Sequence, residues 1–387
     1  AIGYDAGRHN NGGSRNTYIG YNTNPSDTSA SYNNCTVIGY SAQSTGDNQI
    51  VLGTSAQTTY IPGSLEVTGL TVGRGGGSVS GNTAIGSSAL SSNSSGTQLT
   101  ATGMFALYAN TSGHYNVATG AFALKENTTG SKNTANGLQA LYANTTGSEN
   151  VATGYYALRN NTTASQNVAT GFYALSSNTT GIYNTANGTN SLRSNIAGSY
   201  NAATGHGSLY NNTSGAGNVA NGHRALYTNT TGAYNSATGY LPLYSNTTGS
   251  YNVANGHEAL KSNTTGSYSV AIGRGTLTSN TTGGFNTGIG STVLFDNTTG
   301  EYNTASGYLA MMSNTEGNCN VANGYEALKS NTTGDYNTAT GEKALKANTT
   351  GELNTSIGAS SLETNTTGQS NTATGFGALK GNTTGSY

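Results

Sequence analysis

The stretch YNVANGHEALKSNTTG, residues 251–266, decides the fold, because close copies of it recur along the chain. With Gly256 as the reference position, a glycine occupies the same place every 17 residues from Gly86 to Gly375, eighteen times without insertion or deletion. Loops ordinarily tolerate changes of length, so this regularity indicates that every residue of the unit has a fixed place. The sequence is therefore typical of a tandem-repeat protein.

Several positions of the unit hardly vary between copies. The fourth residue after the reference glycine is Leu in seventeen copies, with Met311 the exception, and the seventh is Asn in all eighteen. The tenth is Gly in seventeen, with Ala164 the exception, and the second residue before the glycine is Ala in sixteen. We predict that the Leu and Ala columns form a narrow core. The Asn column should stabilise turns by bonding its own backbone and a neighbouring coil.

These residue types favour a β-solenoid over a helical repeat or a disordered chain. Asn, Thr and Gly are poor helix formers, and a helical repeat needs roughly 30 residues or more. The 26 Tyr and the near balance of 14 basic and 15 acidic residues do not fit disorder. We predict an all-β chain, a β-roll of 17-residue coils with two strands of about five residues and two turns each. The two glycines of the unit should supply the positive φ that tight turns need.

The chain divides into three segments by the regularity of its pattern. Residues 1–59 carry looser repeats, at 16–20, 35–39 and 50–53, which are spaced 19 and then 14 residues apart. Residues 60–79 alternate apolar and polar side chains and are predicted to be a β connector. Residues 80–387 form the regular solenoid, which at about 4.8 Å per coil would be a rod about 85 Å long. Both ends lie in mid-motif, so we expect the chain to be a piece of something longer.

One small residue raises the question of a second chain. The third residue after the reference glycine stays small, as at Ala106 and Ala123. On a strand it would face opposite to the Leu that follows it, and an outward small residue suggests close packing against another copy. We therefore expect the chain to assemble with other copies of itself. The alternative is a bend that turns both residues inward.

Composition and motifs exclude several function classes. The charges are few and spread out, so no basic footprint for nucleic acid or another polyanion is visible. We expect no membrane insertion, because no apolar run is long enough. Catalytic triads, phosphate-binding loops and zinc patterns are absent from the sequence, so we expect no enzyme activity and no cofactor. His206 and His223 share a column, but Tyr240 interrupts the series and we expect no metal site.

Two surface features could make contacts. Aromatic residues cluster one and two positions after the reference glycine and form a candidate surface-contact patch, comprising Phe105, Phe122, Tyr155, Tyr156, Phe172 and Tyr173. Such rings stack on sugars or bury against a partner, although they could also fill a turn. The fifth position is mostly Tyr, Lys or Arg, which we interpret as a solubilising stripe on an exposed strand. The sixteen Asn-x-Thr/Ser sequons in one column are better explained by turn chemistry than by glycans.

The repeat resembles two related groups of proteins. Residues 82–86 and the 14-residue step from Gly39 to Gly53 look like the head repeats of trimeric autotransporter adhesins. The phrase Asn-Thr-Ala-Thr-Gly-x-x-Ala-Leu-x-x-Asn-Thr-Thr-Gly is similar to the shaft repeats of phage tail-fibre proteins. Residues 63–69 of the connector also look like tail-fibre sequence. The resemblance implies a homotrimeric β-roll fibre that lies on the surface of a virion or elsewhere outside the cell.

We therefore expect the shaft of a phage-type tail fibre that presents a receptor-binding element and contacts host cell-surface glycans or a receptor. A bacterial cell-surface adhesin or extracellular matrix fibre is the first alternative. An ice-binding solenoid is the second, because Thr-x-Thr rows such as Thr372 and Thr374 could line a flat face. Asn residues interrupt that row, at Asn136, Asn187, Asn221, Asn255 and Asn323.

Overall fold

The computed structural model describes residues 1–29, 31–54, 64–67 and 70–386. The chain forms two compact units, Ala1–Pro62 and Gly63–Tyr387. In the first unit, strands β1 (Thr17–Ile19), β3 (Thr36–Ile38) and β5 (Ile50–Leu52) pair in parallel. Their registers are offset by the 19 and 14 residues that the sequence indicated. Two shorter strands, β2 (Asn24–Pro25) and β4 (Gln43–Ser44), form a second parallel pair.

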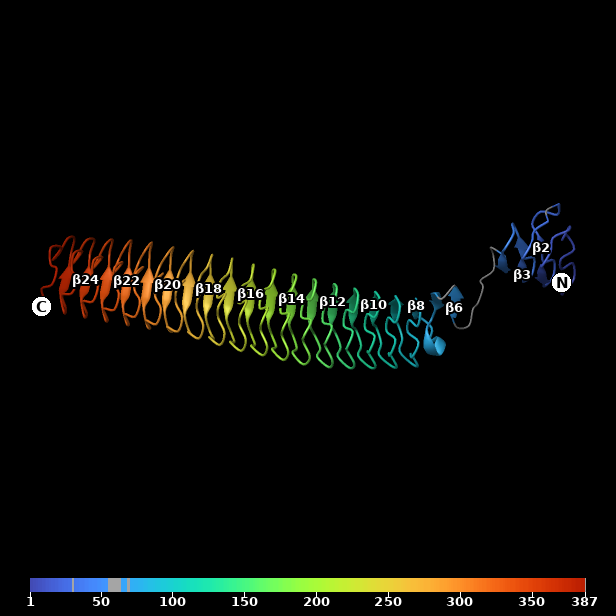
Figure 1. Cartoon of the computed structure of the whole chain (residues 1–387), viewed down its shortest axis with the longest axis horizontal. Helices are drawn as coiled ribbons and strands as arrows, with labels where there is room; N and C mark the ends of the chain where they lie inside the picture. The colour runs from blue at the N-terminus through green and yellow to red at the C-terminus, as the bar shows by residue number, and fades with distance from the viewer. Residues whose placement is uncertain (30, 55–63, 68–69, 387) are drawn as a thin grey trace. The chain divides into compact units, whose positions relative to one another are not determined.

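The second unit is the predicted β-solenoid (Figure 1). Eighteen parallel strands, β8 to β25, stack in sequence order, and each residue pairs with its counterpart 17 positions on. The strands are β8 Thr83–Ile85, β9 Thr100–Thr102, β10 Val117–Thr119, β11 Thr134–Asn136, β12 Val151–Thr153, β13 Val168–Thr170, β14 Thr185–Asn187, β15 Ala202–Thr204, β16 Val219–Asn221, β17 Ser236–Thr238, β18 Val253–Asn255, β19 Val270–Ile272, β20 Thr287–Ile289, β21 Thr304–Ser306, β22 Val321–Asn323, β23 Thr338–Thr340, β24 Thr355–Ile357 and β25 Thr372–Thr374.

Part of the predicted connector belongs to this unit and covers the start of the stack. Strands β6 (Ser64–Val67) and β7 (Leu70–Gly73) pair antiparallel, and β7 pairs antiparallel with β8. A short 3-10 turn, η1 (Gly76–Ser78), follows, and the amide of Gly76 donates to the carbonyl of Leu90 at 2.8 Å. The connector therefore caps the edge of the first coil. Residues 60–63 and 68–69 of the predicted connector lie outside the described residues.

Each coil of the regular solenoid contains one strand of three residues, whereas the sequence predicted two strands of about five residues. The second predicted strand, around the Ala-Leu pair, is a succession of turns. Its Leu residues have φ between 46° and 54°, which is left-handed backbone. The turns still bond between coils, because the Leu260 amide donates to the Thr276 carbonyl at 3.0 Å. Sequence propensity did not indicate this conformation, because left-handed backbone is uncommon for residues other than Gly.

The left-handed Leu also corrects the expectation of an outward small residue. Ala106 and Leu107 are adjacent, yet both are fully buried in the solenoid. Because the Leu turns back into the coil, the Ala before it faces the core too. The core therefore consists of three columns: the strand Ala, the turn Ala and the Leu. The small residue gives no reason to expect a second chain, and the homotrimer stays a prediction without that support.

The Leu column should tolerate Met but not Ile. Left-handed φ is a genuine outlier for a β-branched side chain, and no Val or Ile occurs in this column. A buried Leu-to-Met or Leu-to-Ile change ordinarily costs less than about 1.5 kcal/mol. We expect Leu260→Ile to cost about 2 kcal/mol more than Leu260→Met, since left-handed backbone adds strain of that order. Thermal unfolding of the two variants compares them, and equal stability would mean that Leu260 does not adopt this conformation.

The two glycines of the unit are required for different reasons. The reference glycines have φ between 116° and 147°, as predicted. The glycines at the tenth position do not have positive φ, so that part of the prediction was wrong. There a Cβ atom would lie too close to the next coil; at Gly249 it would be 2.3 Å from the Gly266 carbonyl oxygen. Ala164 is accommodated by local widening, because the Thr162 amide lies 3.5 Å from the Thr179 carbonyl.

Candidate functional surface

Two ladders of buried asparagine side chains hold the coils in register. At the seventh position, the Asn263 Nδ2 donates to Asn246 Oδ1 at 2.8 Å and to the Gly266 carbonyl at 2.9 Å. At the fourth position before the reference glycine, the backbone amide of Asn235 donates to Asn218 Oδ1 at 3.0 Å. These bonds recur in successive coils and satisfy polar groups that burial would otherwise penalise. The predicted role of Asn in turns and between coils is confirmed.

The sequon column is the first of these ladders, so its asparagines are not available to carry sugars in the folded chain. Asn110 and Asn263 are fully buried, and both amide hydrogens of Asn263 are engaged by protein acceptors. A glycan attached at Nδ2 would have to displace both bonds and the coil packed against them. Turn and ladder chemistry therefore accounts for the repeated Asn-Thr-Thr.

The structure places the candidate surface-contact patch in two clusters. Phe105 and Phe122 stack with ring centroids 5.5 Å apart. The four-ring cluster lies further along the rod, beyond the intervening coil that contributes Leu138 and Gln139, and comprises Tyr155, Tyr156, Phe172 and Tyr173. A hydrogen bond with Tyr156 raises the pKa of Tyr155 to about 12, so the Tyr155 hydroxyl stays uncharged at neutral pH.

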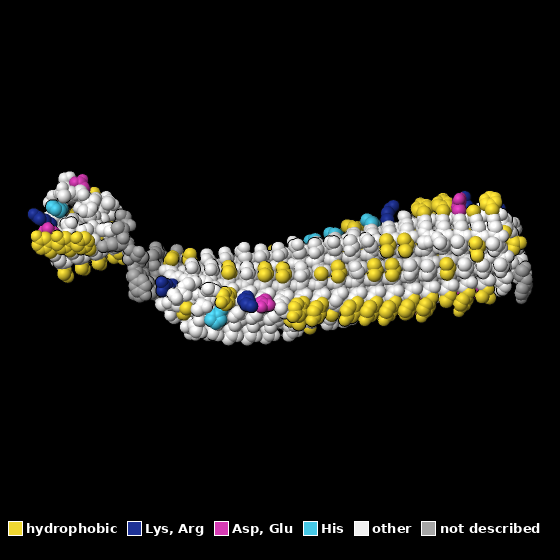
Figure 2. Space-filling model, turned by 180° about the vertical axis from the view of Figure 1, so that it is seen from behind, with side chains coloured by type: hydrophobic (Ala, Val, Ile, Leu, Met, Phe, Trp, Pro, Cys, Tyr) yellow, Lys and Arg dark blue, Asp and Glu magenta, His cyan; other side chains and the backbone are white. Residues whose placement is uncertain are grey.

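A longer aromatic feature escaped the sequence prediction. The residue five positions before the reference glycine forms a stripe of exposed, face-stacked rings, comprising Tyr234, Tyr251, Tyr268, Phe285 and Tyr302. Neighbouring centroids are 4.8 to 5.1 Å apart. Figure 2 shows such apolar side chains as a yellow row along the lower edge of the rod. The recurrent Tyr at this position was the available signal. Because the rings cover one another, this tyrosine stripe presents edges and hydroxyls to solvent, not faces.

The stripe at the fifth position lies on the turn and not on a strand, which corrects the prediction. Its tyrosines stack in places, as Tyr210 and Tyr227 do at 5.0 Å. Several of its lysines form ion pairs with Glu, such as Lys261 with Glu258 at 2.7 Å. The side chains are half-buried. They therefore pack along the turn in addition to any solubilising effect.

Glu326 forms the most enclosed ion-pair group in the described part of the chain. Its carboxylate lies 2.7 Å from both Lys329 and Lys346, and only 8% of its side chain is exposed. Hydrogen bonds from these lysines lower the pKa of Glu326 below its ordinary 4.5. A lowered folded-state pKa gives stability that is present above about pH 4.5 and lost as pH falls through the folded value.

We therefore expect Glu326→Gln to flatten the acid limb of the stability profile. The wild-type chain should lose its advantage over this variant as pH falls below about 4.5, because protonation removes the ion pairs. Melting temperatures of both proteins from neutral to acidic pH measure the effect. A constant difference across that range would show that the carboxylate charge contributes nothing.

Histidines line one edge of the rod without forming a metal site (Figure 2). His206 and His223 stack at 5.5 Å, and the stack continues through Tyr240 to His257. The sequence predicted that Tyr240 interrupts the series. Tyr240 instead continues the stack of rings between His223 and His257. Among the residues that the structure describes, no three His, Cys, Asp or Glu side chains lie close enough to hold a metal ion.

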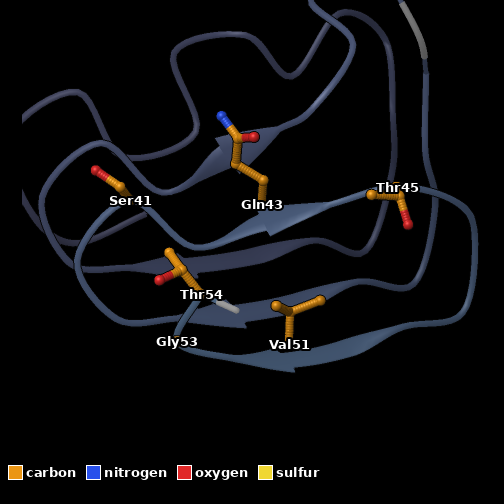
Figure 3. A pocket seen from close by; sticks show the side chains of 6 residues that line it. All are labelled: Ser41, Gln43, Thr45, Val51, Gly53 and Thr54. Atoms are coloured by element: carbon orange, nitrogen blue, oxygen red, sulfur yellow. The ribbon is translucent and has the colours of Figure 1, made fainter. Parts of the chain in front are cut away.

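A pocket of about 270 Å³ lies in the first unit (Figure 3). Its lining consists of Ser41, Gln43, Thr45, Val51, Gly53 and Thr54. None of these side chains titrates near neutral pH, so the pocket offers no general acid or base.

Comparisons with known proteins assign the chain to no family. No protein-family model matches the chain, and a search of curated proteins finds no relative. Within the described ranges, no helix is long and apolar enough to cross a membrane. The sequence and the structure together define the class of this protein as an all-β tandem-repeat solenoid. The likeness to tail-fibre and adhesin repeats stays a prediction.

Proposed function

We propose that this chain is a structural and adhesive fibre segment, the shaft of a phage-type tail fibre that presents a receptor-binding element. The observation that carries the proposal is the uninterrupted stack of eighteen coils tied together by backbone and Asn ladders. Each coil is marginal without its neighbours. The hydrogen-bonded ladders that join every coil to the next stiffen the stack along its whole length. The function is mechanical and needs no catalytic group. Its location would be the virion surface or the extracellular space.

Immunogold electron microscopy tests this proposal. An antibody raised against the recombinant chain is applied to cultures of the source organism and to particles purified from them. Gold on the tails of particles supports the shaft, and gold on the cell envelope supports the adhesin or matrix-fibre alternative. Gold confined to the cell interior contradicts both.

The outward face of the solenoid strands favours one second candidate, ice binding. Residues at both outer positions of a strand, such as Thr372 and Thr374 of β25, are exposed and repeat at the strand spacing. Asn replaces Thr at the second of these outer positions in several coils and interrupts the array, as at Asn221 and Asn255. Thermal hysteresis of the purified chain measures this activity directly, and its absence rejects the candidate.

A further inference from the structure

The charges of the chain are balanced overall but not along the rod. Between Glu149 and Glu258 the sequence contains no Asp, Glu or Lys, and its only permanently charged side chains are Arg159, Arg193 and Arg224. Elsewhere in the described solenoid, lysines pair with nearby carboxylates, as Lys132 does with Glu149 and Lys261 does with Glu258. This segment therefore keeps three cations without a counter-charge from its own sequence.

The three arginines lie on one side of the coil and at regular intervals. They follow their reference glycines by five, five and two residues in every second coil, which places them about 10 Å apart along the rod. The fifth and second positions adjoin, because the Arg159 guanidinium lies 5.0 Å from the ring centre of Tyr156. Arg193 likewise lies over Tyr173 at 4.7 Å, and Arg224 over Tyr227 at 5.3 Å. We name this surface the arginine belt.

The guanidinium groups have donors to spare. Among the described residues, none of the three arginines forms an ion pair. Arg159 donates to Gln139 and Arg193 donates to Tyr210, both at 2.8 Å, and both acceptors are neutral oxygens. The Arg224 Nε is buried without a protein partner. Guanidinium donors prefer planar anions such as carboxylates. The belt is thus complementary to a ligand with regularly spaced negative charge.

Hydroxyl groups and ring edges surround the arginines. Tyr210, Tyr227 and Tyr244 stack at 5.0 to 5.3 Å, so their faces are covered and their edges point outward. Single-stranded nucleic acid binds by stacking its bases on open aromatic faces, which the covered rings do not offer. Each strand of a duplex carries a phosphate about every 3.4 Å, which is denser than the spacing of the arginines. An extended disaccharide is about as long as two coils. A linear polysaccharide with one carboxylate per disaccharide therefore fits both the spacing and the hydroxyl-rich surroundings.

We infer that the arginine belt binds a linear acidic polysaccharide along the axis of the rod. This inference rests on the proposed function, because it names the surface glycan that the fibre would contact. It also revises the expectation from sequence that no polyanion binds, since the overall charge balance conceals the acid-free segment.

The test measures binding of the full chain to hyaluronan, to the same polysaccharide with its carboxyls reduced to alcohols, and to an oligothymidylate of similar length. We expect hyaluronan to bind at least about tenfold more tightly than the reduced form, because charge-assisted bonds contribute more than a factor of ten each. The difference should shrink with added salt. Equal binding of the two polysaccharides, or tighter binding of the oligonucleotide, would overturn the inference.

Variants locate the site. The triple variant Arg159→Gln, Arg193→Gln and Arg224→Gln should lose at least about tenfold in hyaluronan affinity. Its matched control, Lys125→Gln, Lys132→Gln and Lys343→Gln, removes the same charge at lysines already paired with Glu. The control should bind as the wild type does, and an equal loss in both would show attraction to net charge alone. Immunogold labelling can place the fibre on particles even when no polysaccharide binds, so the two proposals fail separately.

Discussion

Replacing Asn263 by Asp is expected to destabilise the solenoid by about 3 to 5 kcal/mol at neutral pH, the cost of a buried charge without a partner. A carboxylate cannot donate the two bonds that the amide makes to Asn246 and Gly266. Its lone pairs would instead face those acceptors at a fully buried position. Burial disfavours the charged form and raises the carboxyl pKa. The penalty should therefore be small near pH 4, the ordinary value, and grow as pH rises.

Asn160 provides the matched control, because it is exposed and one residue before the same ladder. Asn160→Asp should change stability by no more than about 0.5 kcal/mol. Hydrogen exchange of peptides from the mutated coils, together with thermal unfolding, reports the local effect in a repeat protein that does not unfold as one unit. Similar stability of the two variants would mean that the Asn ladder does not hold the coils.

The second large effect is expected at the reference glycines. Gly239 has φ of 132°, and a Cβ there would lie 2.5 Å from the Gly256 carbonyl oxygen. We expect Gly239→Ala to cost about 4 kcal/mol, from backbone strain and overpacking together. Gly249→Ala should cost less, about 1 to 3 kcal/mol from overpacking alone, because its backbone has no positive φ to strain.

Ala164 occupies the position equivalent to 249 in another coil, so the fold can accept an Ala there. Thermal unfolding of both Ala variants gives the comparison. If Gly249→Ala were as costly as Gly239→Ala, positive φ would not be what distinguishes the two glycine columns.

The sequence predicted the features that depend on periodicity. An invariant spacing of 17 residues stacks like on like, so the Leu and Ala core columns, the Asn ladder and the parallel in-register strands follow from it. The left-handed Leu did not follow, because positive φ is uncommon for residues other than Gly and the repeat pattern gives no sign of it. The second predicted strand and the outward Ala failed for the same reason.

The surface was less predictable than the core. Aromatic residues in one column were expected to lie together, and Tyr155 and Phe172 do, at 5.2 Å. The tyrosine stripe was not predicted, because a Tyr that recurs with the repeat does not by itself show that its ring is exposed. The unpaired arginines were not predicted, because Lys261 and Arg193 share a column and differ in whether a Glu lies within reach.

X-ray fibre diffraction from oriented rods of the purified chain tests the central claim, that this protein is a stack of coils along one axis. The account predicts a strong reflection at about 4.8 Å along the rod axis, the distance between hydrogen-bonded strands. A strong 4.8 Å reflection perpendicular to that axis, or none in either direction, would contradict it.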